Sequence, residues 1–406
     1  MKSHEIKELL DEKISRQRTK QLLIELVRVP SPQTDLLEDE PLLREFIRNE
    51  IEPRLHAMGF AEFRYDAMGN LVTSYGADKS GKSLLFVGNA MNQPASTMPN
   101  PYNGDVVDGA KYGLPGECVM GKGASEQKAH LASLLHAMET VIASKVPITG
   151  KLIFACCVSG ETGKHDAIKS VIEGEGVRAD MAVLGGTGLK ITLGNRGRID
   201  VFVTVKGAPC HSARPWDGAN AITGAIETIR LFLSKTKLDQ SHPQLGNQTL
   251  TVNKIQSFPN STHTVQDRVE FRLDRRLLPG EDPNEAFAEL VRIAKEAEQF
   301  KDPVSGKGFT VEMKLGPFMY PSLISVDSPI VRALLHGTEI MLRAPAETYY
   351  SPSAFDQGYL NHVGIPTANF GAGENQWAHT DYDMASVERA TDAARVLAFV
   401  VLDHLT

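Results

Sequence analysis

Residues 119–132 read VMGKGASEQKAHLA and combine a glycine-punctuated turn with the start of an apolar helix. Gly121 and Gly123 punctuate the turn, and Ser125 is of a type that caps helix N-termini. Glu126 falls in the first helical turn, where the helix dipole favours a negative charge. Such a carboxylate is suited to hold a cation, although a capped core helix with an acidic first turn gives the same pattern.

Length and composition narrow the class of protein. The 406 residues are enough for two domains, and 42% hydrophobic with 23% charged residues is the composition of a globular protein. The net charge of -7 leaves no basic surplus for nucleic-acid binding. We find no apolar run of about 18 residues, so no membrane span is predicted. The charged start lacks the apolar core of a signal peptide, and we therefore expect a cytoplasmic protein.

Helical and strand patterns alternate through the first half of the chain. Helical spacing of apolar residues marks 5–27, 42–58, 129–144 and 167–173, and strand-like runs mark 62–65, 70–75, 83–88, 151–158 and 181–184. The alternation predicts an α/β sheet with helices on both faces, a doubly wound domain.

From Ile199 the rhythm changes. A strand, a helix, two strands, a helix and a strand follow at 199–206, 219–234, 248–258, 264–277, 284–299 and 309–315. The order β-α-β-β-α-β is the ferredoxin-like unit. We therefore predict a discontinuous α/β domain of residues 1–196 and 317–406 with a ferredoxin-like insert at 197–316. The insert's amphipathic helix and strand pair suit pairing of two inserts across a twofold axis, which predicts a homodimer.

The stretch around Glu126 resembles the Gly-Arg-Gly-x-x-Asp-x-Lys segment of the dinuclear-zinc aminoacylases and carboxypeptidases, metallopeptidase family 20. Succinyl-diaminopimelate desuccinylase and acetylornithine deacetylase belong to that family. Its architecture, an α/β body with a ferredoxin-like lid or dimerisation domain, is similar to the one predicted here, so the resemblance covers nearly the whole chain. In the family the Asp bridges two metal ions, and its position here is Glu126.

Three loops that would follow strands depart from the family pattern. Where the family carries a metal-ligand His-x-Asp, this chain has Asn89-Ala90-Met91, and an amide is a poor zinc ligand. The family's Glu-Glu pair, general base then ligand, is Gly160-Glu161, which keeps the ligand and loses the base. A shift of the alignment by one residue makes Glu161 the base and removes a ligand instead. The next family carboxylate is replaced by Gly186.

Other positions keep the family pattern. His379, after Gly371-Ala372-Gly373, resembles the closing metal-ligand histidine. The resemblance thus implies that Glu126, Glu161 and His379 hold at most one divalent ion, zinc or manganese, and we expect the other site to be empty. His211 in the insert resembles the histidine that reaches across a dimer to polarise the scissile carbonyl.

Further candidates are weighed against structural roles. Arg276 resembles the arginine that grips a substrate carboxylate, and a strand-end surface ion pair is the alternative. Asn260 and Asn89 are further substrate-binding candidates. Cys156 and Cys157 are expected to be core residues. His165 is a candidate substitute ligand or base. We favour the alternative, a solvated loop histidine.

These observations predict a hydrolase-like enzyme for an amide or related C–N bond of a small carboxylate-bearing substrate. Its metal site is degenerate and its general base altered, with Glu161, His211 and Glu126 as the catalytic residues. Two alternatives stay open. One is a non-catalytic binding protein that keeps the pocket without metals, and the other is a metal-free lyase or hydrolase that uses Glu126, Glu161 or His379 as acid and base.

Overall fold

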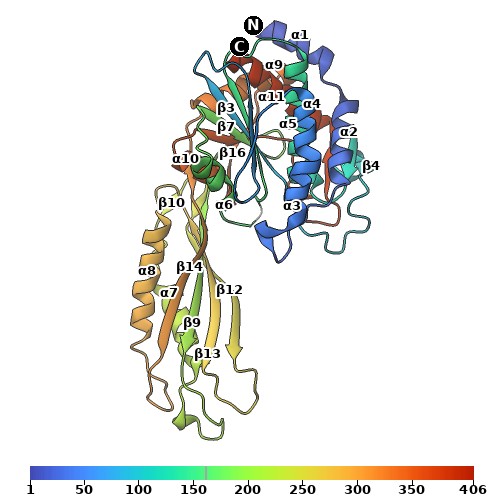
Figure 1. Cartoon of the computed structure of the whole chain (residues 1–406). Coiled ribbons are helices and arrows are strands. Elements are labelled where there is room, and N and C mark those ends of the chain that lie inside the picture. Colours follow the sequence, from blue (N-terminus) through green and yellow to red (C-terminus); the bar gives the residue numbers. More distant parts are fainter. Residues whose placement is uncertain (161) are drawn as a thin grey trace. The chain divides into compact units, whose positions relative to one another are not determined.

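The computed structural model describes residues 1–160 and 162–406 (Figure 1). Contacts divide the chain into two compact units. The first comprises Met1–Gly194, Leu323–Tyr350 and Tyr359–Thr406, and the second comprises Asn195–Ser322 and Ser351–Gly358. Within the described residues, no helix is both long and apolar enough to cross a membrane.

The first unit is organised on a six-stranded sheet with the order β1-β2-β6-β3-β7-β17. The bounds of its strands are β1 Phe63–Tyr65, β2 Leu71–Tyr75, β3 Ser83–Asn89, β6 Lys151–Cys157, β7 Met181–Leu184 and β17 Thr367–Asn369. β3 pairs in parallel with β6 and β7, and β17 pairs in parallel with β7. The carboxyl ends of these four strands therefore meet at one edge of the sheet, where ligand sites of open α/β sheets form.

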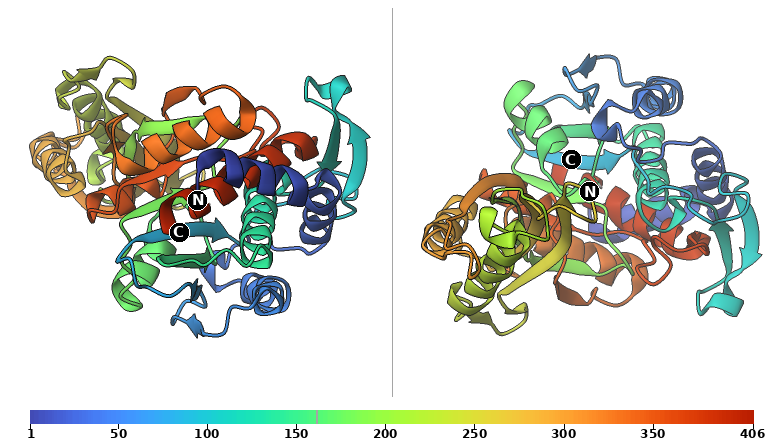
Figure 2. Two further views of the ribbon diagram at one scale, coloured as in Figure 1. Left: turned by 90° about the horizontal axis from the view of Figure 1, so that it is seen from above. Right: turned by 90° about the horizontal axis from the view of Figure 1, so that it is seen from below.

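Helices cover this sheet. Their bounds are α1 Ser3–Lys13, α2 Arg16–Val27, α3 Pro41–Phe46, α4 Glu52–Met58, α5 Ala129–Ala143, α6 Asp166–Lys169, α9 Pro329–Leu342, α10 Gln357–His362 and α11 Val387–Leu405. Figure 2 places α9 and α11, in orange and red, on the opposite side of the strands from the green α6. Most of α5 is buried, because small and apolar residues cover its whole circumference. The predicted α/β class, with helices on both faces, is confirmed.

The second unit is a four-stranded antiparallel sheet with the order β12-β13-β9-β14, packed against two helices. Its elements are β9 Gly197–Lys206, α7 Ala221–Lys235, β12 Thr249–Phe258, β13 Arg268–Leu277, α8 Pro283–Ala297 and β14 Thr310–Met319. Alternate residues of β9, among them Ile199, Val201 and Val203, are buried under the helices. Chain order and sheet order together are those of the ferredoxin-like unit, as predicted.

Three small sheets complete the structure. They are formed by β4 Asp105–Asp108, β5 Glu117–Met120 and β18 Met384–Ser386, by β8 Ile191–Asn195, β15 Ser322–Leu323 and β16 Thr348–Ser351, and by β10 Ser241–His242 with β11 Gly246–Asn247. In the first of these, Met384 pairs with Met120. This pairing brings the segment after His379 beside the segment that leads into the glycine turn at Gly121.

Candidate functional site

The glycine turn before α5 requires its glycines. Gly121 has φ +158, and a Cβ there would lie 2.3 Å from Val27 Cγ1. Gly123 has φ +82, in the left-handed region, and a Cβ there would lie 2.6 Å from Asn92 Cβ. Both the backbone conformation and the close neighbours therefore exclude a side chain at these positions.

A distant carboxylate caps the turn. Asp383 accepts hydrogen bonds from Gly123 N at 2.7 Å and from Ser125 N at 2.8 Å, although it lies 258 residues further along the chain than Ser125. The prediction that Ser125 caps a helix is therefore wrong. Residues Ala124–Lys128 form one π-helical turn before α5 begins at Ala129, and the cap comes from the loop after β17.

Two buried lysines of the stretch fix it to its surroundings. Lys122 Nζ donates to Thr380 O at 3.2 Å and lies 4.0 Å from Asp383 Oδ2. Lys128 Nζ donates to the carbonyls of Leu26 and Val29 at 2.9 and 2.6 Å, and burial lowers its pKa to about 7. Lys122 thereby ties the residue next to His379 to the glycine turn.

Glu126 and His379, two of the predicted metal ligands, lie together. Glu126 Oε2 is 3.3 Å from His379 Nε2, and the two side chains are 27% and 52% exposed. His379 has φ +63, a left-handed conformation that costs energy in a residue with a Cβ. The structure thus holds an accessible imidazole against an accessible carboxylate through a strained backbone.

The third predicted ligand, Glu161, lies outside the described residues. Its neighbour Gly160 is in contact with Asn89, which stands where the family carries a metal-ligand histidine. A Cβ on Gly160 would lie 2.2 Å from Asn89 Nδ2, so the amide occupies the space that a residue-160 side chain would need. Asn89 Oδ1 is buried and has no hydrogen-bond partner in the described part of the chain.

The backbone around Gly186, where the family carries a carboxylate, leaves no space for a side chain. A Cβ on Gly186 would lie 2.7 Å from Phe370 N and 3.0 Å from the carbonyl carbon of Asn369. A backbone neighbour cannot rotate away as a side chain can. No ligand side chain fits at position 186 without a shift of the chain after β17.

Two polar residues at this edge were missed from the sequence. His130, in α5, is 2% exposed and its Nε2 lies 3.1 Å from Val87 O. Glu38 is 7% exposed and accepts hydrogen bonds from Thr162 Oγ1 at 2.6 Å and from Lys164 Nζ at 2.9 Å. Burial raises the pKa of Glu38, but these hydrogen bonds outweigh it and leave the pKa below its usual value. Glu38 therefore holds the loop after β6 as an ionised group.

The donor set does not fit a dinuclear metal centre. Among the described residues, no three His, Cys, Asp or Glu side chains are grouped closely enough to hold a metal ion. Glu126 and His379 supply two ligands, and Asn89 and Gly186 supply no carboxylate or imidazole. A mononuclear site would need a third ligand, for which Glu161 is the sequence-based candidate.

The predicted residues of the second unit are described separately. His211 is exposed, and its Nδ1 accepts a hydrogen bond from Ala213 N at 3.0 Å, which leaves Nε2 to carry the proton of the neutral ring. Arg276 Nε and Nη2 donate to Asp274 at 2.8 and 3.0 Å. The strand-end ion pair considered for Arg276 is thus present. Asn260 is exposed in the turn after β12.

Two structural alternatives from the sequence can be decided. His165 is 5% exposed and packs against Tyr359, with ring centroids 5.6 Å apart, so the expectation of a solvated loop histidine is wrong. Cys156 and Cys157 are fully buried in β6, and burial raises the pKa of the Cys156 thiol. Their predicted place in the core is confirmed.

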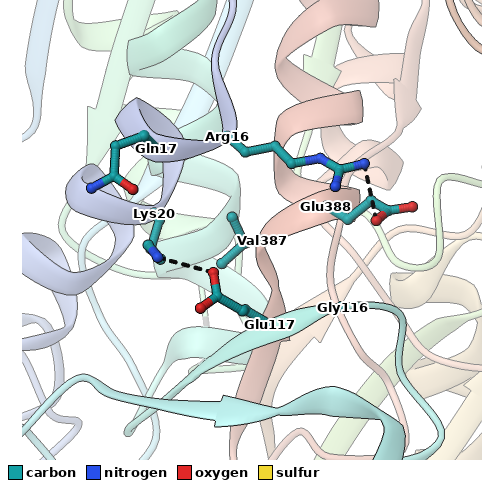
Figure 3. A pocket seen from close by; sticks show the side chains of 7 residues that line it. All are labelled: Arg16, Gln17, Lys20, Gly116, Glu117, Val387 and Glu388. Atoms are coloured by element: carbon teal, nitrogen blue, oxygen red, sulfur yellow. Dashed lines mark hydrogen bonds and ion pairs between the residues drawn. The ribbon is translucent and has the colours of Figure 1, made fainter.

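A pocket of about 230 Å³ lies elsewhere in the first unit, between α2, the start of β5 and the start of α11 (Figure 3). Its charged groups are paired. Lys20 Nζ lies 2.9 Å from Glu117 Oε2, and Arg16 Nη2 lies 3.1 Å from Glu388 Oε2. This pocket presents no unbalanced charge and contains none of the predicted site residues.

Comparison with known proteins extends these observations. Residues 193–301 match the peptidase dimerisation domain of the M20 peptidases. A succinyl-diaminopimelate desuccinylase of Corynebacterium glutamicum is 26% identical over 380 residues, which cover 92% of this chain and 93% of the relative. The uncharacterised protein YgeY of Escherichia coli K12 is 24% identical over 404 residues. The match covers 94% of this chain and 93% of YgeY.

Solved structures share the fold. An M20 metallo-carboxypeptidase from Sulfolobus solfataricus superposes with a TM-score of 0.74 at 17% identity and covers 95% of this chain and 98% of its own. A tripeptidase from Staphylococcus aureus superposes with a TM-score of 0.73 at 20% identity. The superposition covers 96% of this chain and 99% of the tripeptidase chain. Both likenesses extend over the two units, the α/β body and the ferredoxin-like insert.

Proposed function

We propose that this chain, which belongs to the M20 peptidase family and is a hydrolase of C–N bonds, acts on an amide or related bond of a small carboxylate-bearing substrate. Its site holds at most one metal ion and uses an altered general base. The relatives are named as a desuccinylase, a tripeptidase and a carboxypeptidase, activities that all cleave an amide bond. The proposed substrate class follows from these names and from the predicted carboxylate grip of Arg276.

The observation that carries the proposal is the Glu126–His379 pair at 3.3 Å. A carboxylate and an imidazole are side chains that bind divalent metals. They are also the side chains that most often exchange protons in active sites. Buried Lys122 and Asp383 fix the backbone beside each member, because Lys122 Nζ bonds to Thr380 O and Asp383 accepts from Ser125 N. Both members remain accessible to a substrate.

One zinc or manganese ion fits Glu126 and His379 if Glu161 completes the ligand set. Bound there, such an ion would polarise the scissile carbonyl as a Lewis acid. The chain's own groups would then orient the substrate and accept the proton of the attacking water. With Gly160 in place of the family's base, Glu161 is the proposed proton acceptor in the alternative alignment, in which it is no longer a metal ligand.

A metal-free lyase or hydrolase is the second candidate. Glu126 and His379 are already in direct contact at 3.3 Å, so a proton can pass between a carboxylate and an imidazole without an ion between them. Metal content separates this candidate from the first.

His211 and Arg276 are the proposed substrate-side residues of the insert. His211 presents Nε2 as a donor, as a role in polarising a carbonyl requires. Arg276 uses Nε and Nη2 on Asp274 and keeps further N–H donors for a substrate carboxylate. Asn260 and Asn89 are the proposed further contacts.

A homodimer formed through the insert is proposed as well. On α7, apolar side chains stand exposed at helical spacing, with Ile222, Ile226 and Leu233 at 37, 62 and 56%. β12 is an edge strand of ten residues, and its Ile255 is 57% exposed. A long unpaired edge beside an apolar helix stripe is the kind of surface that pairs with a second copy.

Metal analysis and kinetics test the enzymatic proposal. We expect plasma emission to find no more than one tight equivalent of zinc or manganese, and kcat/KM on N-acyl amino acids and dipeptides to fall ~10²–10⁴-fold in Glu126→Gln and His379→Ala. The exposed His4→Ala is the matched control and should retain wild-type turnover. Two tight equivalents, or turnover that survives both site substitutions, would refute the proposed site. Turnover without any metal would select the second candidate.

Light scattering tests the assembly. Wild type is expected to be a dimer at micromolar concentration, and Ile226→Lys is expected to be monomeric because it places a charge in the apolar stripe. Val304→Lys changes an equally exposed apolar residue of the same unit outside α7 and β12 and should remain dimeric. A wild-type monomer would contradict the assembly and the proposed action of His211 across it.

A further inference from the structure

His130 has one defined tautomer. Its Nε2 lies 3.1 Å from the carbonyl oxygen of Val87, which can only accept, so Nε2 carries the proton. Burial lowers the pKa of the ring to about 4, and the imidazole is therefore neutral under ordinary conditions. Nδ1 is then a lone-pair acceptor whose direction is fixed by the hydrogen bond on the other side of the ring.

This acceptor has no partner in the described part of the chain. Nδ1 is buried, and a buried polar atom without a hydrogen bond destabilises the folded chain. The wall around it is made of glycines. A Cβ on Gly371 would lie 3.3 Å from Nδ1, and one on Gly185 would lie 3.3 Å from the ring carbons. These two glycines admit the ring and bring no side chain of their own against Nδ1.

Two further orphaned acceptors occur at the same edge of the sheet. Asn89 Oδ1 at the end of β3 and Asn369 Oδ1 at the end of β17 are buried and lack partners within the described residues. With His130 Nδ1 they are acceptors without charge. An ammonium or amine group needs acceptors for its N–H bonds, and these three atoms are acceptors of that kind.

A second histidine of α5 shows that burial alone does not explain the orphaned atom. His136 is also 2% exposed, and burial likewise lowers its pKa to about 4. Its Nδ1, however, is 2.8 Å from Thr19 Oγ1 and so has a partner. If His130 only filled space, an apolar side chain would do so without the cost of an unsatisfied nitrogen.

We propose that His130 Nδ1, with Asn89 Oδ1, accepts hydrogen bonds from a primary amine or ammonium group of the substrate, in place of the second metal ion. The inference rests on the proposed function, since it assigns a substrate group to the same edge of the sheet. It implies selectivity for substrates with a free amino group over their N-acylated counterparts.

Nitrogen-15 NMR of the histidine rings in Glu126→Gln, in which turnover is expected to be slow, tests the site directly. The probes are a panel of dipeptides, beginning with glycylglycine, and the N-acetylated form of each. We expect dipeptides to move the Nδ1 resonance of His130 toward that of a hydrogen-bonded acceptor and N-acetyl forms to leave it unchanged. His136 should not respond to either.

Binding to variants gives the second readout. His130→Leu should weaken dipeptide binding ~10- to 100-fold, the effect of one hydrogen bond to a charged group, and should not alter binding of the N-acetyl forms. His136→Leu is the matched control and should bind as wild type. An unchanged Nδ1 resonance with every probe, an equal response to acetylated probes, or a response to zinc alone would overturn the proposal. Because neither readout needs turnover, the amino-group site can stand if the hydrolase proposal fails.

Discussion

The two sides of the candidate site are built differently. On one side Glu126 and His379 are accessible and 3.3 Å apart, and buried Lys122 and Asp383 bond to the backbone next to them. On the other side the corresponding edge holds an amide at Asn89, a neutral imidazole at His130 and glycines where the family has carboxylates. The first side is suited to a cation or to proton transfer, and the second is suited to neutral hydrogen bonding.

The difference teaches that the two positions where the sequence predicts a missing ligand are closely packed by their neighbours. Asn89 occupies the space beside Gly160, and the backbone at Phe370 closes the space beside Gly186. Returning a carboxylate to either position would therefore require a second change. The side with Glu126 and His379, in contrast, depends on supports that lie far away in the sequence.

The largest expected effect on stability comes from the support of the charged side. Asp383→Ala removes the cap from Gly123 and Ser125 and leaves buried Lys122 without its carboxylate, which should cost roughly 3–5 kcal/mol of unfolding free energy. Urea denaturation measures it. Asp381→Ala, which loses one exposed hydrogen bond to Thr97, is the control and should cost at most about 1 kcal/mol. Equal costs would show that Asp383 is no special support.

A pH effect comes next, from the neutral side. His130 has a folded-state pKa of about 4 against 6.5 when unfolded, so the unfolded chain binds its proton first as the pH falls. The contribution of this histidine to the free energy of unfolding is fully present above pH 6.5. It falls by roughly 3 kcal/mol as the pH is lowered from 6.5 to 4. Unfolding curves of wild type and His130→Leu between pH 7 and 4 should therefore differ in slope. Parallel slopes would mean that His130 is not buried as a neutral ring.

A smaller effect is expected where backbone closes the old ligand position. Gly186→Ala places a Cβ 2.7 Å from Phe370 N and should cost about 1–3 kcal/mol, because the chain must shift to admit it. Gly174→Ala is the control, since its nearest neighbour would be 3.7 Å away, and it should change stability by about 0.5 kcal/mol or less. Thermal unfolding compares the two. A neutral Gly186→Ala would show that this side can still accept a side chain.

The smallest effect is the coupling between Asn89 and Gly160. Gly160→Ala forces aside the Asn89 amide, whose Nδ2 and Cγ would lie 2.2 and 2.6 Å from the new methyl group. In an Asn89→Ala background these two contacts are gone, and only the Cβ of residue 89 remains at 3.2 Å. A double-mutant cycle should therefore give a favourable coupling of about 1 kcal/mol. Strict additivity would indicate that the two replacements are independent.

The sequence was sufficient for the fold. The alternating patterns and the β-α-β-β-α-β order depend on local periodicity, and they correctly indicated both architectures. Glu126 and His379 were proposed from a family resemblance, and the structure places their side chains 3.3 Å apart. Ser125 was misjudged because the group that caps the turn is Asp383, which is remote in the chain. His165 was misjudged because the ring that packs on it belongs to Tyr359, which is also remote.

The amino acids alone determined which side chains are available: a carboxylate at Glu126, a histidine at His379, an amide at Asn89 and no side chain at Gly160 and Gly186. Only the tertiary structure decided which groups surround these positions. His130 follows an apolar helical pattern in the sequence and is indistinguishable there from a core residue. It is an orphaned acceptor because the Val87 carbonyl fixes its proton and glycines leave its other nitrogen uncovered. Hydrogen-bond partners are set by three-dimensional proximity, which no local pattern records.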